Sequence, residues 1–444
     1  MKLPPVRSTA AVLALTASLA LTGCGQSNDQ PDPDASGGAG ATLTVWFPGN
    51  DPAEVRQVED VIIPAFESAT GAQVEATFVD WGDLSTKLSA AFASGAAPDL
   101  FGHGAAAVAD YAVNERILPL TDYVARWSAE DRQDLSAALP GGTVDGVQYM
   151  IPLRMDGQLL AYDKADFRAA GLDPEQTFDS WEAIRAAAEQ LTVRAADGSI
   201  TRSGLLMATD PIGRQQSFAT LVQAAGGRQV DQSGKVDFDT SAGLAALDFY
   251  TGLYLGQSGQ PAVASGVGVP YSSNAPEQQP LVLDTASITM LNGNGIQKIA
   301  DAKPDFEIGV IAPAGLTAGD APAAFGGPGP GLMINAETKH PDLAWQFITH
   351  LVQPEVNLDY IKTFGGVPVR LSAASDPYVT GNPIMTALVE ALPHLRPNPN
   401  VPGWVQARDT MDQYLEQALN AKAANAELLS QMAAAVDTVL TQSR

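Results

Sequence analysis

Apolar and polar residues follow a rhythm of strands and helices along this chain. Residues 43–47 ("LTVWF") form a short apolar run that predicts a buried strand, and residues 74–79 predict a second. Between them, apolar residues recur at helical spacing after Asp51 and Pro52, which suit an N-cap and a first helical turn. Because strand and helix alternate, we predict an α/β protein with a parallel sheet covered by helices on both faces.

The same rhythm continues towards the C-terminus. The later elements that we predict are a helix over residues 181–191 with a capping box of Asp179 and Glu182, strands over 306–311 and 331–334, and helices over 342–352 and 404–424. No repeat of 20–50 residues is visible in the sequence, which weakens solenoid and propeller interpretations.

The N-terminus has a pattern of its own. Lys2 and Arg7 precede a mostly apolar stretch over residues 10–21, which is short for a membrane span. Leu21-Thr22-Gly23-Cys24 then resembles the lipobox of bacterial lipoproteins, and Cys24 is the only cysteine of the 444 residues. We therefore expect residues 1–23 to be a lipoprotein signal peptide, Cys24 to carry lipid, and residues 24–41 to be a flexible tether. A buried cysteine beside an ordinary signal peptide is the alternative.

Composition limits the partners of the chain. Hydrophobic residues make up 45% of the sequence, which is enough for a sizeable core. The formal net charge of −25, from 50 acidic and 25 basic residues, argues against nucleic acid or an anionic membrane face as a partner.

A search for catalytic patterns finds little. The sequence has no phosphate-binding G-x-x-x-x-G-K-[ST] loop, no G-x-S-x-G nucleophile motif and no H-E-x-x-H, and its four histidines lack metal-ligand spacing. We therefore expect no cofactor and no metal, and these absences give no support for enzymatic activity. Carboxylates are abundant enough that a glycosidase pair stays open, so a lipoprotein enzyme acting on glycans is one alternative function.

Four stretches resemble family 1 extracellular solute-binding proteins, the carbohydrate-binding subunits of ABC importers. They are "TLTVWFPGN", "GAQVEATFVDWGDLSTKLSAAFASGAAPDLF", "DGVQYMIPLRMDGQLLAYDKADFRAAGLDPEQTFDSWEAI" and "FGGPGPGLMINAETKHPDLAWQFITHLVQPEVNLDYIKTFGGVPVR". They occur in the family's order, and the resemblance covers residues 42 to about 419.

The resemblance implies a periplasmic-binding-protein-like fold of two α/β lobes, a ligand cleft between them and a hinge of three chain crossings. We place the crossings near Arg154, Pro313 and Pro354. The N-terminal lobe would comprise residues 42–153 and 313–353, and the C-terminal lobe residues 154–312 and 354–444. The resemblance also implies binding without catalysis, so we expect no enzymatic activity. The expected function is a lipid-anchored, extracytoplasmic monomer that captures a mono- or oligosaccharide and delivers it to ABC transporter permease subunits.

The family's contact positions can be carried over one at a time. A sugar site pairs aromatic platforms with carboxylates, amides and arginines. Trp404 follows a Pro-rich loop where relatives place a stacking tryptophan, although packing at a helix start would also explain it. Asp156 precedes "GQLLAYDK" and is expected to accept hydroxyl hydrogen bonds, with a surface charge at the hinge as the alternative. His103 after "PDLFG" suits a ligand contact or an ordinary loop histidine equally.

Further positions match cleft residues of the family. They are Asn50, Trp81, Arg214, Gln216, Arg154 and Arg370, with Gly327 and Gly329 as sources of backbone amides. Trp81 could line the cleft or the core, and turn geometry alone would explain the glycines.

One position departs from the family. Gly295 in "TMLNGNGIQKI" stands where a cleft tryptophan is expected. The ligand would then be shorter than a long maltodextrin or be held by other aromatics. Three arginines among the candidate contacts keep an acidic or phosphorylated ligand open, such as a uronate or glycerol phosphate.

Overall fold

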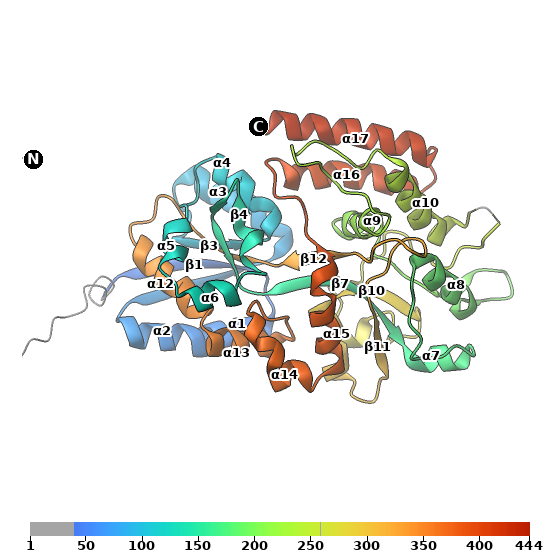
Figure 1. The fold of residues 1–444 in the computed structure, drawn as a ribbon, viewed down its shortest axis with the longest axis horizontal. Coiled ribbons are helices and arrows are strands. Elements are labelled where there is room, and N and C mark those ends of the chain that lie inside the picture. The colour runs from blue at the N-terminus through green and yellow to red at the C-terminus, as the bar shows by residue number, and fades with distance from the viewer. Residues whose placement is uncertain (1–39, 258) are drawn as a thin grey trace, which may run out of the picture. The chain divides into compact units, whose positions relative to one another are not determined.

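The computed structural model describes residues 40–257 and 259–444, and these belong to one compact unit. The expected signal peptide, the lipidation at Cys24 and all but the last residues of the tether lie outside the described residues. Two sheets organise the unit (Figure 1), and we call the elements around them the first and the second lobe.

The first sheet has the strand order β2-β1-β3-β13-β6. Its strands are β1 (Thr42–Pro48), β2 (Gln73–Val79), β3 (Leu100–His103), β6 (Met150–Pro152) and β13 (Gly331–Ile334). β1 runs parallel to β2 and β3 as predicted, whereas β13 is antiparallel to both β3 and β6. The prediction of an all-parallel sheet is therefore wrong, because β13 and β6 are the strands next to the passages between the lobes and run in opposite directions.

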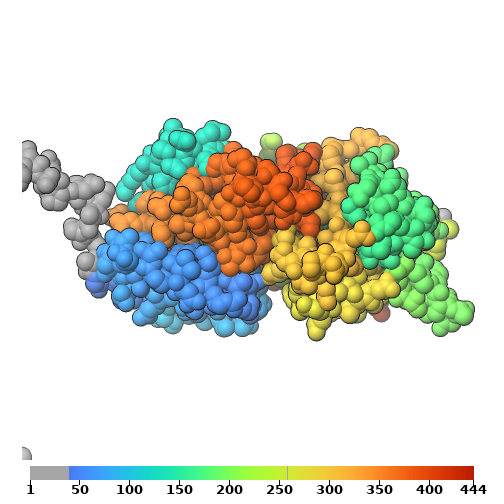
Figure 2. All heavy atoms as spheres, turned by 90° about the horizontal axis from the view of Figure 1, so that it is seen from below, coloured from blue at the N-terminus to red at the C-terminus, as the bar shows by residue number. Residues whose placement is uncertain are grey.

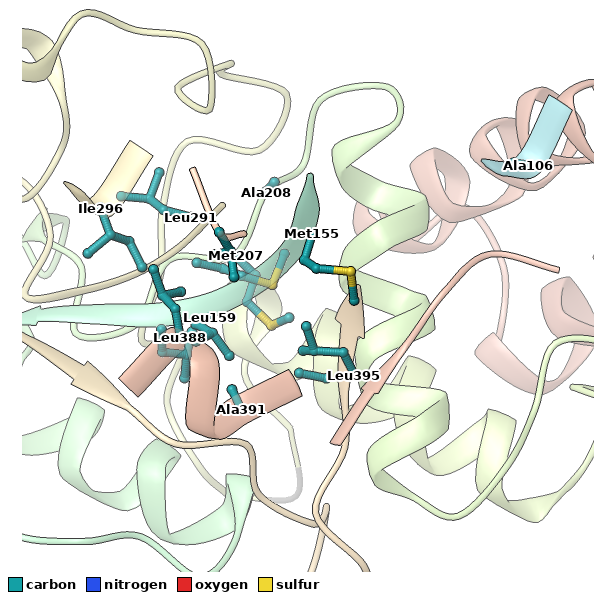
Figure 3. Packing of buried hydrophobic residues seen from close by; sticks show 14 of the residues in the cluster. Ala106, Met155, Leu159, Met207, Ala208, Leu291, Ile296, Leu388, Ala391 and Leu395 are labelled. Atoms are coloured by element: carbon teal, nitrogen blue, oxygen red, sulfur yellow. The ribbon is translucent and has the colours of Figure 1, made fainter. Parts of the chain in front are cut away.

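The second sheet is built around the long strand β7 (Met155–Asp163). β10 (Ile288–Asn292), β11 (Ile308–Ile311) and β12 (Ala324–Pro328) all pair with it antiparallel, and β14 (Leu395–Arg396) extends the sheet beside β12. Figure 3 shows the apolar side chains that pack around β7, with Leu159 beside Leu388 and Met155 near Leu395. This packing makes β7 the central strand of the second lobe.

Helices surround both sheets. In chain order they are α1 (Pro52–Gln57), α2 (Ile63–Thr70), α3 (Trp81–Ser94), α4 (Val108–Val113), α5 (Thr121–Ala125), α6 (Ala129–Asp134), α7 (Lys164–Ala169), α8 (Trp181–Leu191), α9 (Gly213–Ala224), α10 (Ser241–Leu255), α11 (Gly293–Ala302), α12 (Pro341–Leu351), α13 (Pro354–Phe364), α14 (Pro377–Thr380), α15 (Pro383–Ala391), α16 (Trp404–Leu419) and α17 (Asn425–Gln442). α16 and α17 lie side by side and cover α9 and α10 (Figure 1).

Local sequence signals explain several helix ends. Asp51 caps α1 as predicted, because its carboxylate accepts the Ala53 and Glu54 amides. The predicted capping box of Asp179 and Glu182 is wrong by one position: Ser180 is the N-cap of α8, and Asp179 accepts the Ser180 hydroxyl. The predicted helix over residues 404–424 ends earlier, at Leu419, and α17 follows it.

The passages between the lobes connect the two sheets. The chain leaves β6 and enters β7 at Arg154, where we expected a crossing. It returns between Pro328 in β12 and Gly331 in β13, later in the chain than Pro313. α13 packs on α1 and α12 of the first lobe, and α15 packs on α11 of the second, so residues 354–391 run along both lobes (Figure 2). The lobe boundaries given above remain a prediction.

None of the helices within the described ranges has the length and apolar character needed to cross a membrane.

Candidate ligand-binding cleft

A cleft of about 560 Å³ lies between the two sheets. From the first lobe its lining includes Gly49, Asn50, Asp51, Glu54, Trp81, Ser85 and residues 103–106; from the second lobe Gln158, Ile212, Gln216, residues 272–274, Asn292, Asn294, Gly295, Lys298, Phe325, Pro397, Asn398 and Arg408. The passages between the lobes supply Arg154, Gly329 and Pro330. The neighbouring strand ends add Asp156 and Gly157 of β7 and residues 326–328 of β12. The lining is therefore polar, with a few aromatic rings.

Arg154 occupies the passage from β6 to β7 and holds two carboxylates. Its side chain lies 3.6 Å from Glu54 and 3.5 Å from Asp156, over the ring of Phe364. Burial raises the pKa of Glu54, although Arg154 and the hydroxyl of Tyr360, which donates to Glu54, work against this rise. Burial also acts to lower the pKa of Arg154, but the two carboxylates outweigh it and raise that pKa above its ordinary value.

Asp51 and Lys298 join the two lobes at the cleft. Asp51 caps α1 in the first lobe, and Lys298 in α11 of the second lobe donates to its free carboxylate oxygen. Burial acts to raise the pKa of Asp51, but Lys298 and the two capping amides outweigh it and lower the pKa.

A second set of bonds between the lobes involves the loop before α16. The side-chain oxygen of Asn400 accepts the Ala109 amide at 2.9 Å, and its nitrogen donates to the Thr143 carbonyl at 3.1 Å. The Gly403 amide donates to the carboxylate of Asp110. The loop of the second lobe is thus bonded directly to α4 and β4 (Thr143–Val144) of the first.

Trp81 and His103 form the aromatic part of the first-lobe wall. Their rings meet edge to face with centroids 6.1 Å apart, and Trp81 remains 42% exposed. The Gly104 amide donates to Nδ1 of His103, so the ring proton is on Nε2, which donates to Ser85 at 3.2 Å. Burial and, secondarily, the charge of Arg408 lower the pKa of His103 to about 4, so this ring is neutral at pH 7.

The second-lobe wall presents side-chain amides. Gln158 donates to Gln216 at 3.0 Å, which leaves the Gln216 nitrogen free to donate elsewhere. Ile212 at the start of α9 has a φ of 60°, an unusual conformation for a β-branched residue, and its side chain is 47% exposed. Strained backbone of this kind is typical of ligand-contacting segments.

Most of the residues predicted from the sequence line this one cleft. Those brought together are Asn50, Trp81, His103, Arg154, Asp156, Gln216 and Gly327, with Gly329 beside them. The Gly329 amide donates to the Arg154 carbonyl and is therefore not available to a ligand. Gly295 also lines the cleft, at the position where the family pattern suggested a missing tryptophan. A ligand contact by any of them stays a prediction.

Three predicted contacts lie elsewhere in the structure. Trp404 is fully buried at the start of α16, and its indole donates to Asn398, so the predicted stacking on a ligand is replaced by core packing. Arg214 makes a two-point ion pair with Asp412 and is 5% exposed, which ties α9 to α16. Arg370 is held by the Val352 carbonyl, Asp131 and Asp134. In each case hydrogen bonds to other protein groups hold the side chain outside the cleft.

Sequence reasoning missed many polar residues of the cleft, among them Lys298, Asn398 and Arg408. Lys298 lies one helical turn after Asn294, in the "NGNGIQK" segment that was singled out only for its missing tryptophan. Arg408 lies one turn after Trp404, and this spacing could have indicated it. The oxygen of Asn398 accepts from both Gln215 and Trp404, which turns its amide nitrogen the other way.

No cluster of three or more histidine, cysteine, aspartate or glutamate side chains suited to a metal ion occurs within residues 40–257 and 259–444.

Comparisons with known proteins agree with this geometry. A sequence model of the bacterial extracellular solute-binding protein family matches residues 62–387. The chain belongs to this family, which confirms the resemblance described above and identifies a class of proteins that bind solutes without catalysing a reaction.

Individual relatives are distant but cover most of the chain. A binding protein from Brucella abortus is 22% identical over 379 residues, which are 85% of this chain and 88% of the relative. An ABC transporter solute-binding protein from Thermotoga lettingae, solved with α-D-tagatose, is 23% identical with a TM-score of 0.76, covering 90% and 100% of the two chains. The cyclic α-maltosyl-1,6-maltose binding protein from Arthrobacter globiformis is 23% identical with a TM-score of 0.74, covering 91% and 100%. These structures confirm the periplasmic-binding-protein-like fold.

Proposed function

We propose that this protein captures a carbohydrate in the cleft between its lobes and delivers it to the permease of an ABC transporter. The observation that carries the proposal is Trp81, a large aromatic side chain that is 42% exposed inside a cleft lined by hydrogen-bonding groups. An exposed indole inside a cleft gains free energy when an apolar surface covers it, and the apolar face of a sugar ring is a suitable cover.

The polar groups of the cleft suit sugar hydroxyls. Asn50 and Gln216 offer amides, and Asp156 offers a carboxylate whose side chain is 39% exposed although Arg154 lies beside it. Such groups can both donate to and accept from hydroxyls in fixed directions. The volume of about 560 Å³ lies within the range of small-molecule sites. The two structural relatives named above are described with a monosaccharide and with a cyclic oligosaccharide, which further supports this class of ligand.

The proposal extends to the site of action. Cys24 would carry lipid on the outer face of the cell membrane, residues 24–41 would tether the lobes, and a monomer would close around its ligand and dock on the permease. Membership of an extracellular solute-binding family supports the extracytoplasmic location. The lipobox pattern supports the anchor.

The test is a thermal-shift screen of the purified protein against mono- and oligosaccharides, with amino acids and glycerol phosphates as comparison sets. A ligand present at 100 times its Kd adds about 2.7 kcal/mol to the free energy of unfolding, which raises the melting temperature measurably. We expect at least one carbohydrate to do this. A shift by amino acids or glycerol phosphates, with none by any carbohydrate, would contradict the proposal.

A second test addresses the alternative of a glycan-degrading enzyme. The best ligand of the screen is incubated with the protein for days and then analysed by mass spectrometry. We expect its mass to be unchanged.

A further inference from the structure

The cleft holds three basic side chains, and two of them are neutralised by protein carboxylates. Arg154 lies beside Glu54 and Asp156, and Lys298 is paired with Asp51. These three acids are also all the carboxylates that line the cleft. Arg408 is different: within the described ranges it makes no ion pair, and its Nε is buried without a hydrogen-bond partner.

The helix that carries Arg408 does not pair it with a carboxylate. Asp409, the next residue of α16, attracts Arg408 electrostatically, but it is exposed and makes no ion pair with the guanidinium. Asp412 lies one turn further along α16, where an aspartate often pairs with an arginine. Both of its carboxylate oxygens instead accept from Arg214 of α9, at 2.7 Å each. Glu416, one more turn along, also lies beside Arg214, at 3.7 Å. Asp412 and Glu416 are therefore directed at α9, and the guanidinium of Arg408, which lines the cleft, is left without a paired carboxylate.

The aromatic part of the first-lobe wall, formed by Trp81 and His103, offers no anion either. Arg408 and His103 both line the cleft, and the charge of Arg408 contributes to the lowered pKa of His103. His103 is neutral at pH 7, and its ring proton is engaged with Ser85. Trp81 stands edge-on to the same ring. The cleft therefore combines an exposed aromatic face with a guanidinium that makes no ion pair, whereas all the carboxylates that line it lie beside the other two cations.

A partly buried cation without a hydrogen-bonded counter-charge is unfavourable, and a ligand that supplies one gains from relieving it. A guanidinium matches a planar carboxylate with two parallel hydrogen bonds. A phosphate monoester carries a charge of about −1.5 to −2, which one free cation would only partly balance, whereas a carboxylate carries a single charge. From these observations we infer that Arg408 binds the carboxylate of an acidic sugar, so that the preferred ligand is a uronic acid or an oligosaccharide that contains one.

This inference rests on the proposed function, because it specifies the class of carbohydrate. The experiment is calorimetric titration with matched ligands: galacturonate against galactose, glucuronate against glucose, digalacturonate against a neutral disaccharide, and glucose 6-phosphate as the phosphate probe. The proteins are the wild type, Arg408→Gln and Arg228→Gln. Arg228 is an exposed arginine of the second lobe outside the cleft, so its variant removes one positive charge elsewhere.

We expect the wild type and Arg228→Gln to bind at least one acidic sugar tenfold or more tighter than its neutral partner. Arg408→Gln should lower the affinity for that acidic sugar about 10- to 100-fold and change the affinity for the neutral one much less, because only the charged hydrogen bonds are lost. Raising the salt concentration should lower the affinity for the acidic sugar and leave the affinity for the neutral one nearly unchanged. The melting temperature of Arg408→Gln without ligand should not fall, because no internal bond of Arg408 is broken.

Three results would overturn the inference. Neutral sugars could bind as well as acidic ones, with Arg408→Gln weakening both alike; the proposed function would then stand and only the ligand class would be wrong. Glucose 6-phosphate could be the ligand that depends on Arg408, and the anion would then be a phosphate. Finally, no carbohydrate of either kind could bind, and the proposed function would fail together with the inference.

Discussion

Two tryptophans of this chain occupy opposite environments. Trp81 is 42% exposed in the cleft, whereas Trp404 is fully buried and hydrogen-bonded to Asn398. We predict that Trp81→Ala lowers the affinity for the best carbohydrate about 10- to 100-fold, because burying an aromatic side chain contributes roughly 1.5–3 kcal/mol. Calorimetric titration measures this loss, and the melting temperature without ligand should change little.

Trp404→Phe is the matched control for this variant. It removes the indole bond to Asn398 inside the core, so it should lower the melting temperature, with a smaller effect on affinity that reaches the cleft only through Asn398. A stable Trp81→Ala variant with unchanged affinity would mean that Trp81 does not contact the ligand.

His103 makes the stability of the protein depend on pH. Burial, assisted by the charge of Arg408, lowers its pKa to about 4, while the unfolded chain binds the proton near the ordinary value of about 6.5. As the pH falls from about 6.5 towards 4, the unfolded state takes up more protons and the free energy of unfolding decreases. We predict that His103→Gln removes roughly 2–3 kcal/mol of this decrease by pH 4.5. Urea unfolding of both proteins at pH 7 and pH 4.5 measures the difference, and equal losses would contradict the prediction.

Single positions divide into those that the sequence could predict and those it could not. Asn50 follows β1 and Asp156 lies at the start of β7, both next to the cleft, so their positions in the chain were enough to place them there. Trp404 and Arg214 sit at the starts of helices, where sequence position does not reveal which face of the helix meets the cleft. Arg408 was missed because its isolation depends on Asp412 being bound by Arg214, a contact between residues 198 positions apart.

At the scale of elements, α1 and α11 meet through the Asp51–Lys298 ion pair. We predict that Lys298→Met and Asp51→Asn, which both break the pair, each change the free energy of unfolding by less than about 1 kcal/mol, because the pair is partly exposed. Asn is as good an N-cap as Asp, so Asp51→Asn leaves the cap of α1 intact. Urea unfolding at low salt measures the effect, which should shrink at high salt.

The double variant provides the control for this prediction. Once Asp51→Asn has removed the charge, Lys298→Met should add little further change, because the two residues act as one pair. If the effects of the two single variants add up in the double variant, the ion pair contributes nothing to the free energy of unfolding.

Elements with strong local patterns agreed with their predictions. The strand predicted over residues 43–47 is β1, and the helix predicted over residues 342–352 is α12 within one residue. The sequence failed where distant segments decide the outcome. The direction of β13 follows from the passage between lobes, and the separation of α16 from α17 depends on how both helices pack on α9 and α10.

At the scale of the whole molecule, the proposed lipid anchor and the binding unit should be separable. We predict that Cys24→Ala leaves the protein in the soluble fraction or mislocalised, because the acyl chains that hold it to the membrane are lost. Its far-ultraviolet circular dichroism and melting temperature should equal those of the wild type after detergent extraction, because the compact unit begins after Cys24. Cell fractionation is the measurement, and a variant that is still processed and membrane-bound would rule out the lipobox.

The hydrogen bonds of Asn400 and Gly403 with the first lobe have a consequence for the conformational equilibrium. They involve protein groups alone, so they favour the approach of the lobes whether or not a solute is bound. A solute needs to supply only the remaining free-energy difference between the separated and the approached arrangement of the lobes. Its apparent affinity rises with the fraction of molecules that already have the approached arrangement. Part of the apparent affinity is therefore set outside the cleft, at Asn400 and Gly403, which do not line it: mutations there would rescale the affinity for every solute by the same factor and leave their ranking unchanged.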